Sequence, residues 1–163
     1  MYTIRKVSKE EAAVIHRLGT EVYHTTYTAI LSPAQINFML RKNYSPEAIQ
    51  QSMLNGQDFY LIFQEETHPL GFIALQKKSE DILRIEKLYL LADSQGLGLG
   101  KKLIDFAVEK AKELDYSALE LNVNRGNKAY HFYLRQGFQV MKEVDIPYYD
   151  FILDDYVMQR LVR

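Results

Sequence analysis

Polar capping residues divide the first third of the chain into short amphipathic stretches, which follow an apolar strand pattern at residues 2–7. Ser8 and Glu11, three positions apart, have the spacing of a capping box, which predicts the start of a helix. Ser32 and Ser45 each precede a proline that suits the first helical position, so two more helices should begin there. The expected helices run from Ser8 towards Tyr23, over 33–41 and over 46–54.

From residue 59 the pattern changes to apolar runs that are rich in aromatic and β-branched residues and separated by polar breaks. The breaks are too short for a crossover helix, so these runs should pair as antiparallel strands. Between Leu99 and Leu114, apolar residues recur at helical spacing and charged residues fill the other side, which predicts an amphipathic helix packed on a sheet. The expected strands of this section are 59–63, 70–76 and 82–91.

In the last third of the chain, the pattern predicts a strand, a helix and then two final strands, with a hairpin around Pro147. The whole order of elements predicts an α+β fold with a central mixed, mostly antiparallel sheet flanked by helices. No repeat or linker interrupts the pattern, so residues 1–163 are expected to form a single domain. The elements of this last section are strand 118–123, helix 127–136, strand 138–146 and strand 149–162.

Composition and charge exclude several classes of function. The 163 residues include no cysteine, which excludes disulfides, thiolate metal sites and a cysteine nucleophile. The 4 histidines show no metal-ligand spacing, so no metal is expected. A formal net charge of -1 gives no general attraction to nucleic acid or to an anionic membrane. No apolar run could span a bilayer and the N-terminus lacks the apolar core of a signal peptide, so a cytoplasmic location is expected.

The stretch DSQGLGLGKK places Gly96, Gly98 and Gly100 at the mouth of the amphipathic helix. Backbone N–H groups at a helix start lack partners and the helix dipole makes that end positive, so a phosphate can bind there, and glycine lets it approach the backbone. Lys101 and Lys102 oppose the dipole unless an anion offsets their charge, which favours a phosphate ligand over an ordinary glycine-rich turn. The spacing fits neither the dinucleotide-binding pattern nor the nucleotide P-loop.

The spelling Q-x-x-G-x-G, from Gln95 to Gly100, resembles the acetyl-coenzyme A (acetyl-CoA) pyrophosphate loop of the GNAT family of N-acetyltransferases. RIEKLYL, residues 84–90, is similar to the fourth strand of that family, and NKAYHFYLRQGF, residues 127–138, to its later helix. The order of elements is also that of the GNAT fold. The resemblance implies acetyl-CoA as cosubstrate, bound by Leu88, Tyr89, Leu90, Gln95, Gly96, Leu97, Gly98, Leu99, Gly100, Lys101, Asn122 and Asn127.

The same resemblance implies direct transfer of an acetyl group to a primary amine, which needs a base for the ammonium and an acid for the departing thiolate. Tyr133 matches the family tyrosine that protonates the thiolate, while a packing role for this aromatic residue stays open. Glu86 stands where many family members carry a glutamate that faces the acceptor, so it is the expected base, directly or through water. Arg84 lies on the same strand face, so a plain ion pair is the alternative for Glu86.

Three segments, GTEVYHTTY, INFMLRKNYSPEAIQQSM and FILDDYVMQRLV, resemble the bacterial spermidine/spermine N-acetyltransferases of this family. They imply a small-molecule amine acceptor, a polyamine, with Tyr27 near the amine, while a role of Tyr27 in packing the helix stays open. A peptide or protein N-terminus, another small amine and a non-catalytic acyl-CoA sensor are the alternatives, and a homodimer through the last strand is a further expectation. A polycation needs carboxylates along its path, and the candidates are Glu21, Glu86, Asp145, Asp150, Asp154 and Asp155.

Overall fold

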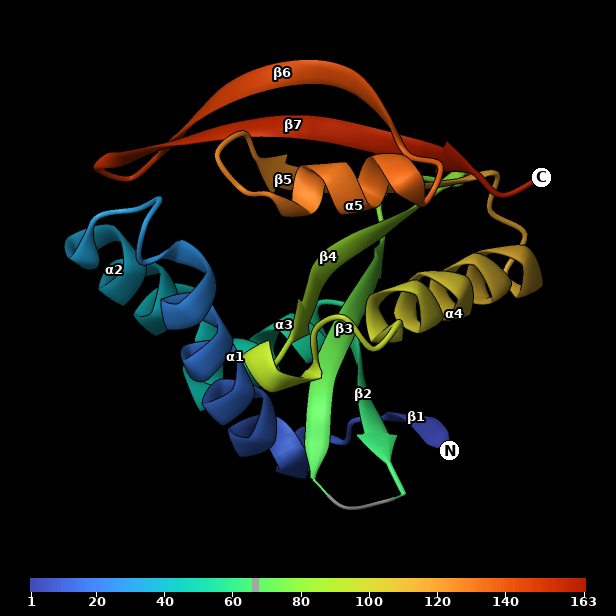
Figure 1. Ribbon diagram of the computed structural model, residues 1–163, viewed down its shortest axis with the longest axis horizontal. Helices are drawn as coiled ribbons and strands as arrows, with labels where there is room; N and C mark the ends of the chain where they lie inside the picture. Colours follow the sequence, from blue (N-terminus) through green and yellow to red (C-terminus); the bar gives the residue numbers. More distant parts are fainter. Residues whose placement is uncertain (66–67) are drawn as a thin grey trace.

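The computed structural model describes residues 1–65 and 68–163, and its strands form one twisted sheet (Figure 1). The strand order is β1-β2-β3-β4-β5-β7-β6. Neighbouring strands are antiparallel except β4 and β5, which run parallel. The predicted mixed, mostly antiparallel α+β sheet is therefore confirmed. The strands are β1 Tyr2–Lys6, β2 Asp58–Gln64, β3 Pro69–Lys77, β4 Ile82–Leu90, β5 Ala118–Asn124, β6 Gln139–Tyr148 and β7 Phe151–Leu161.

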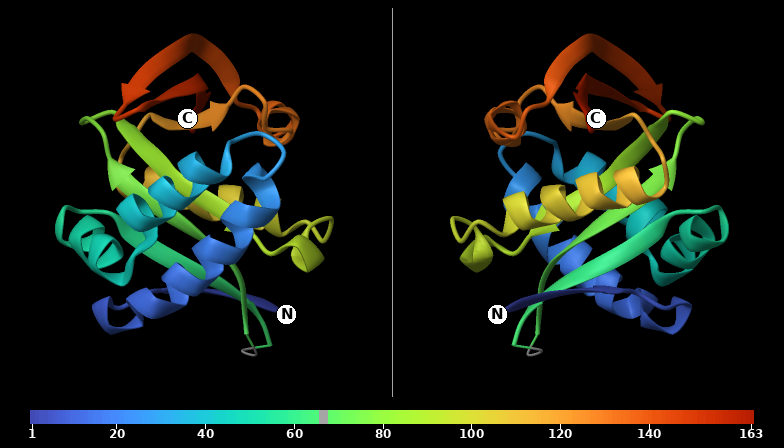
Figure 2. Two further views of the ribbon diagram at one scale, coloured as in Figure 1. Left: turned by 90° about the vertical axis from the view of Figure 1, so that its left-hand side faces the viewer. Right: turned by 90° about the vertical axis from the view of Figure 1, so that its right-hand side faces the viewer.

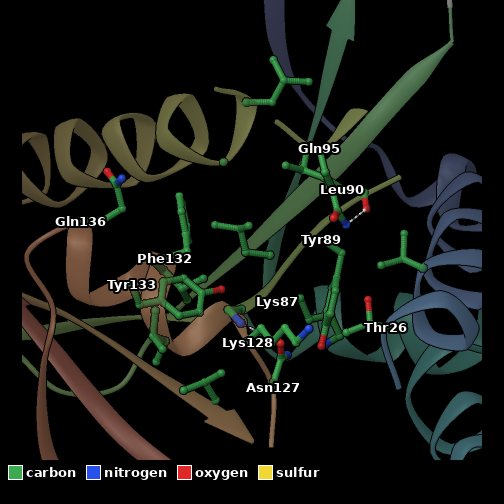
Figure 3. Close-up of a pocket in the computed structure, with 18 of the residues that line it drawn as sticks. Thr26, Lys87, Tyr89, Leu90, Gln95, Asn127, Lys128, Phe132, Tyr133 and Gln136 are labelled. Carbon is green, nitrogen blue, oxygen red and sulfur yellow. Dashed lines mark hydrogen bonds between the residues drawn. The ribbon is translucent and has the colours of Figure 1, made fainter. Parts of the chain in front are cut away.

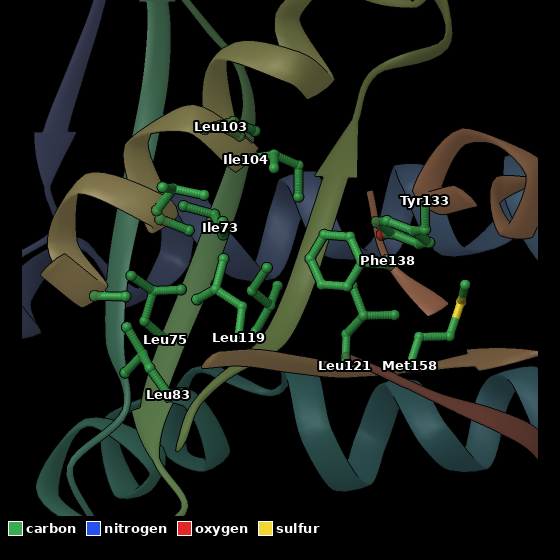
Figure 4. Close-up of a cluster of buried hydrophobic side chains, with 14 of the residues drawn as sticks. Ile73, Leu75, Leu83, Leu103, Ile104, Leu119, Leu121, Tyr133, Phe138 and Met158 are labelled. Carbon is green, nitrogen blue, oxygen red and sulfur yellow. The ribbon is translucent and has the colours of Figure 1, made fainter. Parts of the chain in front are cut away.

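Helices cover both faces of this sheet (Figures 1 and 2). Helices α1 to α3 pack on one face through a hydrophobic cluster that includes Phe59 and Phe72. Helices α4 and α5 pack on the other face around Ile73, Leu119 and Phe138 (Figure 4). The helices are α1 Ala12–Tyr27, α2 Pro33–Tyr44, α3 Pro46–Leu54, α4 Leu99–Glu113 and α5 Ala129–Arg135, with short 3-10 turns η1 Lys9–Glu11 and η2 Ala92–Ser94.

The capping residues begin the helices as the sequence predicts. The Ser8 backbone N–H donates to Glu11 Oε1 at 3.0 Å, although the first turn is the 3-10 turn η1 and α1 follows it. Ser32 and Ser45 accept from the backbone N–H three residues on, at 3.1 and 3.2 Å. Helix α3 has the predicted bounds, whereas α1 and α2 run several residues further because their last residues, Tyr27 and Tyr44, are buried in the core.

The predicted final hairpin is present, and its turn lies at Tyr149 and Asp150, two residues after Pro147. Pro147 lies inside β6, opposite Ile152. A proline is tolerated there because β6 is an edge strand and its outward backbone positions need no donor. Tyr149 adopts the left-handed conformation that the tight turn requires, with φ of 57°.

Strands β4 and β5 separate soon after they begin. They pair only from Ile82 to Arg84 on β4 and from Ala118 to Glu120 on β5. Beyond this point β4 has a bulge, because Ala74 of β3 faces Lys87 while Leu75 faces Ile85, and Glu86 between them faces no residue. The far half of β4 is thus free of hydrogen bonds to β5, and a cleft opens between the two strands.

Candidate active site

A cavity of about 740 Å³ lies between the separated strands, bounded by α1, the glycine loop, the start of α4, and α5 (Figure 3). Leu97, one of the predicted cofactor-binding residues, does not line it, and its side chain is 53% exposed. The structure brings together the other predicted site residues as lining groups: Tyr27, Glu86, Leu88, Tyr89, Leu90, Gln95, Gly96, Gly98, Leu99, Gly100, Lys101, Asn122, Asn127 and Tyr133.

The glycine loop depends on left-handed backbone conformations. Gly96 and Gly98 have φ values of 81° and 77°, which strain any residue that carries a β-carbon. A β-carbon at either position would meet no atom within 4 Å, so the space beside both glycines is open. Gly98 is the N-cap residue of α4 and has no side chain that could accept a hydrogen bond from the helix. The N–H groups of the first turn have no acceptor within the helix either. This arrangement suits an anion at the loop.

Gly100 is needed for a different reason. A β-carbon there would lie 2.9 Å from Cζ of Phe132, so glycine lets α5 approach the start of α4. The sequence interpretation, which gave all three glycines to ligand approach, missed this packing role. Phe132 itself lines the cavity and was also missed, because an aromatic residue on an amphipathic helix carries no signal that separates a core residue from a cavity wall.

The two lysines at the start of α4 point to different neighbours. Lys101 lines the cavity and its Nζ lies 2.7 Å from Oδ2 of Asp105. Lys102 does not line the cavity, and its Nζ lies 5.6 Å from the ring centroid of Tyr2. Of these two lysines, Lys101 is therefore the one that an anion in the cavity can reach.

Tyr133 comes from α5, and its ring packs between Phe132 and Phe138, with centroid distances of 5.3 and 5.8 Å. Its hydroxyl is directed into the cavity and makes no hydrogen bond to a described side chain or backbone group (Figure 3). Burial raises the pKa of Tyr133 above the ordinary value, so the phenol is protonated at neutral pH. Both readings from the sequence fit the ring, which packs in the core while its oxygen faces the cavity.

Four tyrosines from three elements cluster beside the cavity, which Tyr27 and Tyr89 line. We call them the tyrosine wall: Tyr23 and Tyr27 of α1, Tyr44 of α2 and Tyr89 of β4. The hydroxyls of Tyr27 and Tyr89 are 3.1 Å apart and hydrogen-bonded. Burial is the main cause that raises the pKa of both phenols. This side of the cavity therefore offers neutral hydroxyl groups.

Glu86 lines the cavity and is also paired. Arg84 Nε donates to Glu86 Oε1 at 3.1 Å, so the ion pair that the sequence left open is present. The same guanidinium donates through Nη1 to Glu120 Oε2 at 2.8 Å and to Asn122 Oδ1 at 2.9 Å. The side chain of Glu86 is 28% exposed, which leaves its carboxylate accessible from the cavity.

Two neighbouring carboxylates of β7, Asp154 and Asp155, have no cationic partner within hydrogen-bond distance in the described part of the chain. Asp155 Oδ2 accepts from Asn122 Nδ2 at 3.3 Å, and Asp154 Oδ1 accepts from Asn124 Nδ2 at 3.0 Å. Burial raises the pKa of Asp155 above its ordinary value. Neither residue lines the cavity directly, but Asn122 connects Asp155 to it.

The remaining candidate carboxylates lie elsewhere. Asp145 Oδ1 pairs with Arg125 Nη2 at 2.6 Å. Glu21 and Asp150 are exposed and do not line the cavity. Of the acidic residues that the sequence offered for a polycation, Glu86 lines the cavity and Asp155 is joined to it through Asn122.

Lys87 is a cavity residue that the sequence did not reveal. Its Nζ donates to Gln57 Oε1 at 2.6 Å and lies over the rings of Tyr44 and Phe59, 5.6 and 5.4 Å from their centroids. Burial lowers the pKa of Lys87 to about 8. Strand alternation would place Lys87 on the α4 side, and the bulge at Glu86 turns it to the side of α1 to α3.

A smaller hollow of about 300 Å³ between α1 and α2 contains His16 and His24. His16 Nδ1 lies 2.6 Å from the backbone oxygen of Tyr44, so this ring joins the two helices. Residues 1–65 and 68–163 contain no group of three or more acidic or histidine side chains that could hold a metal ion. They also contain no helix that is long and apolar enough to cross a membrane.

Comparison with known proteins identifies similar sequences along most of the chain. The family described as acetyltransferase (GNAT) domain matches residues 27–146. Spermidine N(1)-acetyltransferase from Thermoplasma acidophilum is 29% identical, over 93% of this chain and 94% of that protein. Peptidyl-lysine N-acetyltransferase YjaB from Escherichia coli is 32% identical, over 61% of this chain and 63% of that protein.

Solved structures agree with these sequence similarities. The crystal structure of PaiA N-acetyltransferase from Thermoplasma acidophilum in complex with coenzyme A superposes with a TM-score of 0.83. The match has 27% identity and covers 99% of both chains. The whole order and arrangement of elements described above is thus shared with a protein that has been crystallised with coenzyme A.

Proposed function

Because the chain belongs to the GNAT family and is an acetyl-CoA-dependent N-acetyltransferase, we propose that its acceptor is a polyamine that binds between the tyrosine wall and β7. The observation that carries the choice of a polyamine is the carboxylate of Asp155, which is joined to the cavity residue Asn122 and has no cationic partner within hydrogen-bond distance among the described residues. Similarity to a spermidine acetyltransferase over nearly the full length supports it.

The residues of the cavity fit acetyl-CoA. The uncapped N–H groups at the start of α4 and the open space at Gly96 and Gly98 suit a diphosphate. The backbone of residues 88–90 lacks hydrogen bonds to β5, so it is free to pair with an extended amide-containing arm. Acetyl-CoA supplies the activated thioester. In this proposal Leu88 to Leu90, Gln95 to Lys101, Asn122 and Asn127 bind it, and for Leu97 only the backbone takes part, because its side chain lies outside the cavity.

Tyr133 is proposed to give a proton to the departing thiolate. Its raised pKa keeps the phenol protonated at neutral pH, so a proton is present beside the sulfur when the thiolate departs. The hydroxyl has no hydrogen-bond partner among the described residues that would hold this proton back. Packing by Phe132 and Phe138 fixes the ring, so the oxygen is held in one place.

Glu86 is proposed to take the proton of the acceptor ammonium, directly or through water. An ammonium must lose a proton before its nitrogen can attack, and a carboxylate in the cavity can accept it. One oxygen of Glu86 bonds to Arg84, which leaves the other oxygen for the amine or for water. Tyr27 and Tyr89 then present hydroxyl oxygens to the same amine from the tyrosine wall.

An acceptor screen tests the polyamine proposal. Purified protein, acetyl-CoA and either spermidine, spermine, a lysine-containing peptide or a peptide of neutral sequence are mixed, and released coenzyme A is measured with a thiol dye. Spermidine and spermine should be acetylated faster than both peptides. Added salt should weaken acceptor binding more than acetyl-CoA binding, because it screens the carboxylates.

The alternatives have distinct outcomes in this screen. Efficient turnover of the lysine-containing peptide without turnover of polyamines would support a peptidyl-lysine acceptor, which the similarity to YjaB favours. Tight acetyl-CoA binding without transfer to any amine would support an acyl-CoA sensor. Asp155→Asn should raise KM for spermidine by about tenfold while leaving acetyl-CoA affinity unchanged, since one ammonium loses its partner.

A further inference from the structure

Four charged side chains alternate in sign at the point where β4 and β5 separate: Lys78, Glu120, Arg84 and Glu86. Lys78 Nζ lies 2.5 Å from Glu120 Oε2, Arg84 Nη1 lies 2.8 Å from the same oxygen, and Arg84 Nε lies 3.1 Å from Glu86 Oε1. We call this set the ion chain. It leads from a partly exposed lysine outside the cavity to the carboxylate that lines it.

Glu86 has no neighbour across the sheet to fix its direction. It is the extra residue of the β4 bulge, so no residue of β3 opposes it, and β5 has already diverged. Arg84 provides the hydrogen bond that holds its side chain in the described structure. The position of this carboxylate in the cavity therefore depends on the guanidinium of Arg84.

Arg84 is itself held in one orientation. It occupies the last paired position of β4 and β5, opposite Glu120. Its planar guanidinium uses Nε for Glu86 and Nη1 for Glu120 and Asn122, so a rotation that kept one contact would break another. Its side chain is 19% exposed, which limits competition from water.

Glu120 anchors the ion chain from behind. Its side chain is only 2% exposed, and an ionised carboxylate is stable there only with strong partners. Burial acts to raise the pKa of Glu120, but hydrogen bonds from Lys78, Gln159 and Arg84 outweigh it and the pKa lies below the ordinary value. Glu120 is thus ionised at neutral pH and holds Arg84.

We infer that Arg84 is a positioning residue for acetyl transfer, which holds Glu86 at the acceptor amine while Glu120 and Lys78 hold Arg84. The inference rests on the proposed role of Glu86 as the base. Arg84 does not line the cavity, so it acts through Glu86 and not on the substrates. A lysine at position 84 would keep the charge that Glu120 needs, but one ammonium on a flexible stem cannot reproduce the planar fork.

A double-mutant cycle tests this inference with Arg84→Lys, Glu86→Gln and the double variant, using the best acceptor from the screen above. Arg84→Lys should lower kcat about tenfold and leave the KM for acetyl-CoA within about twofold. In the Glu86→Gln background the same change should have no further effect on kcat, because the side chain that Arg84 positions is already inactive. Thermal melting of each variant confirms that it is folded.

A second variant keeps the test decisive if Arg84→Lys folds poorly. Lys78→Met removes the outermost charge of the ion chain at a side chain that is 44% exposed and outside the cavity. It should lower kcat about twofold to threefold without changing acetyl-CoA affinity, and this loss should also vanish in the Glu86→Gln background.

The outcomes separate the inference from the proposed function. Wild-type kcat in a folded Arg84→Lys variant, or an equal loss of kcat with and without Glu86, would show that Arg84 does not act through Glu86. Wild-type turnover in Glu86→Gln would remove both Glu86 as base and the inference, and the acetyltransferase activity would stand. A wild-type protein that acetylates no amine at all would instead contradict the proposed acceptor class.

Discussion

Burial raises the pKa of Tyr133 and lowers the pKa of Lys87, and in both cases it favours the neutral side chain. For Tyr133 the shift strengthens its hold on the proton. For Lys87 the shift favours loss of the proton, although the rings of Tyr44 and Phe59 and the oxygen of Gln57 offset part of the lost hydration. The site therefore combines a retained phenol proton with a cation that is less stable than a solvated lysine.

Replacing Tyr133 with phenylalanine should separate rate from binding. The variant removes only the oxygen and keeps the ring between Phe132 and Phe138, so the fold and the acetyl-CoA affinity should be unchanged. Turnover should fall by about 100-fold, the usual contribution of a general acid. Steady-state kinetics measures the fall, and calorimetry with coenzyme A is the control. Undiminished turnover would show that Tyr133 is a packing residue and not the general acid.

Lys87 should make stability depend on pH. Its pKa is about 8 in the folded protein against an ordinary value of 10.5, so between these values the unfolded chain binds more protons and stability rises with pH. Relative to Lys87→Met, the wild-type free energy of unfolding should therefore increase by about 2 kcal/mol from about pH 7 to about pH 10. Urea denaturation of both proteins measures this difference. A difference that stays constant with pH would argue against a depressed pKa.

At the scale of elements, the glycine loop joins β4 to α4 and owes its shape to Gly98 more than to the side chains around it. Gly98→Ala introduces a β-carbon at φ of 77°, which costs about 1 kcal/mol and turns N–H groups away from the cavity. Acetyl-CoA affinity should fall by about tenfold in calorimetry.

Gly56→Ala is the matched control for Gly98→Ala. Gly56 also has a positive φ, of 98°, with open space for a β-carbon, but it follows α3 and does not line the cavity. It should lose similar stability and keep wild-type acetyl-CoA affinity. Equal affinity losses in both variants would mean that general destabilisation, and not the loop, weakens binding.

Elements with a long periodic pattern could be predicted from the sequence, and those that depend on partners could not. The amphipathic pattern from Leu99 and the Ser-Pro caps gave helices with nearly the observed bounds. The bulge at Glu86 could not be predicted, because it arises from the register between β3 and β4. The final turn was predicted two residues too early, because the place of Pro147 inside β6 depends on β6 being an edge strand, which is a property of the whole sheet.

The candidate site was predictable to the extent that short motifs mark it. The glycine loop and the helix with Tyr133 carry such motifs, and their residues line the cavity apart from Leu97. Lys87 carries none, because the bulge decides which face it joins. Asn122 connects to Arg84 and Asp155 through contacts between strands that are distant in the sequence, so only the fold reveals them.

At the scale of the molecule, the β6–β7 hairpin reaches across to α2 (Figure 1). Phe38 of α2 packs against three rings of the hairpin end, with centroid distances of 6.1, 5.0 and 5.5 Å to Tyr148, Tyr149 and Phe151. Tyr148 also donates to Asn43 Oδ1 at 3.3 Å. This contact joins the two walls between which we place the acceptor.

Phe38→Ala should weaken the contact between α2 and the β6–β7 hairpin. The KM for the acceptor should rise by about fivefold, which corresponds to about 1 kcal/mol of lost aromatic contact, while acetyl-CoA affinity is unchanged. Phe106→Ala is the control, because it removes a ring pair with Tyr60, at 4.7 Å, outside the cavity. An unchanged acceptor KM in Phe38→Ala would mean that the hairpin contact does not shape the acceptor site.

The homodimer stays a prediction, with exposed Met141 and Ile152 on the same hairpin.

The short pairing of β4 with β5 divides the sheet into two blocks, β1 to β4 and β5 to β7, whose hydrogen-bonded seam spans Ile82 to Arg84 on β4. Few hydrogen bonds cross this seam, so the blocks are joined mainly by one hydrophobic cluster to which both contribute, for example through Ile73 and Leu119. A ligand that pairs with the free half of β4 lies along the same line and lengthens the seam. We therefore expect bound acetyl-CoA to couple the two blocks more tightly, which slower amide exchange along β4 would show.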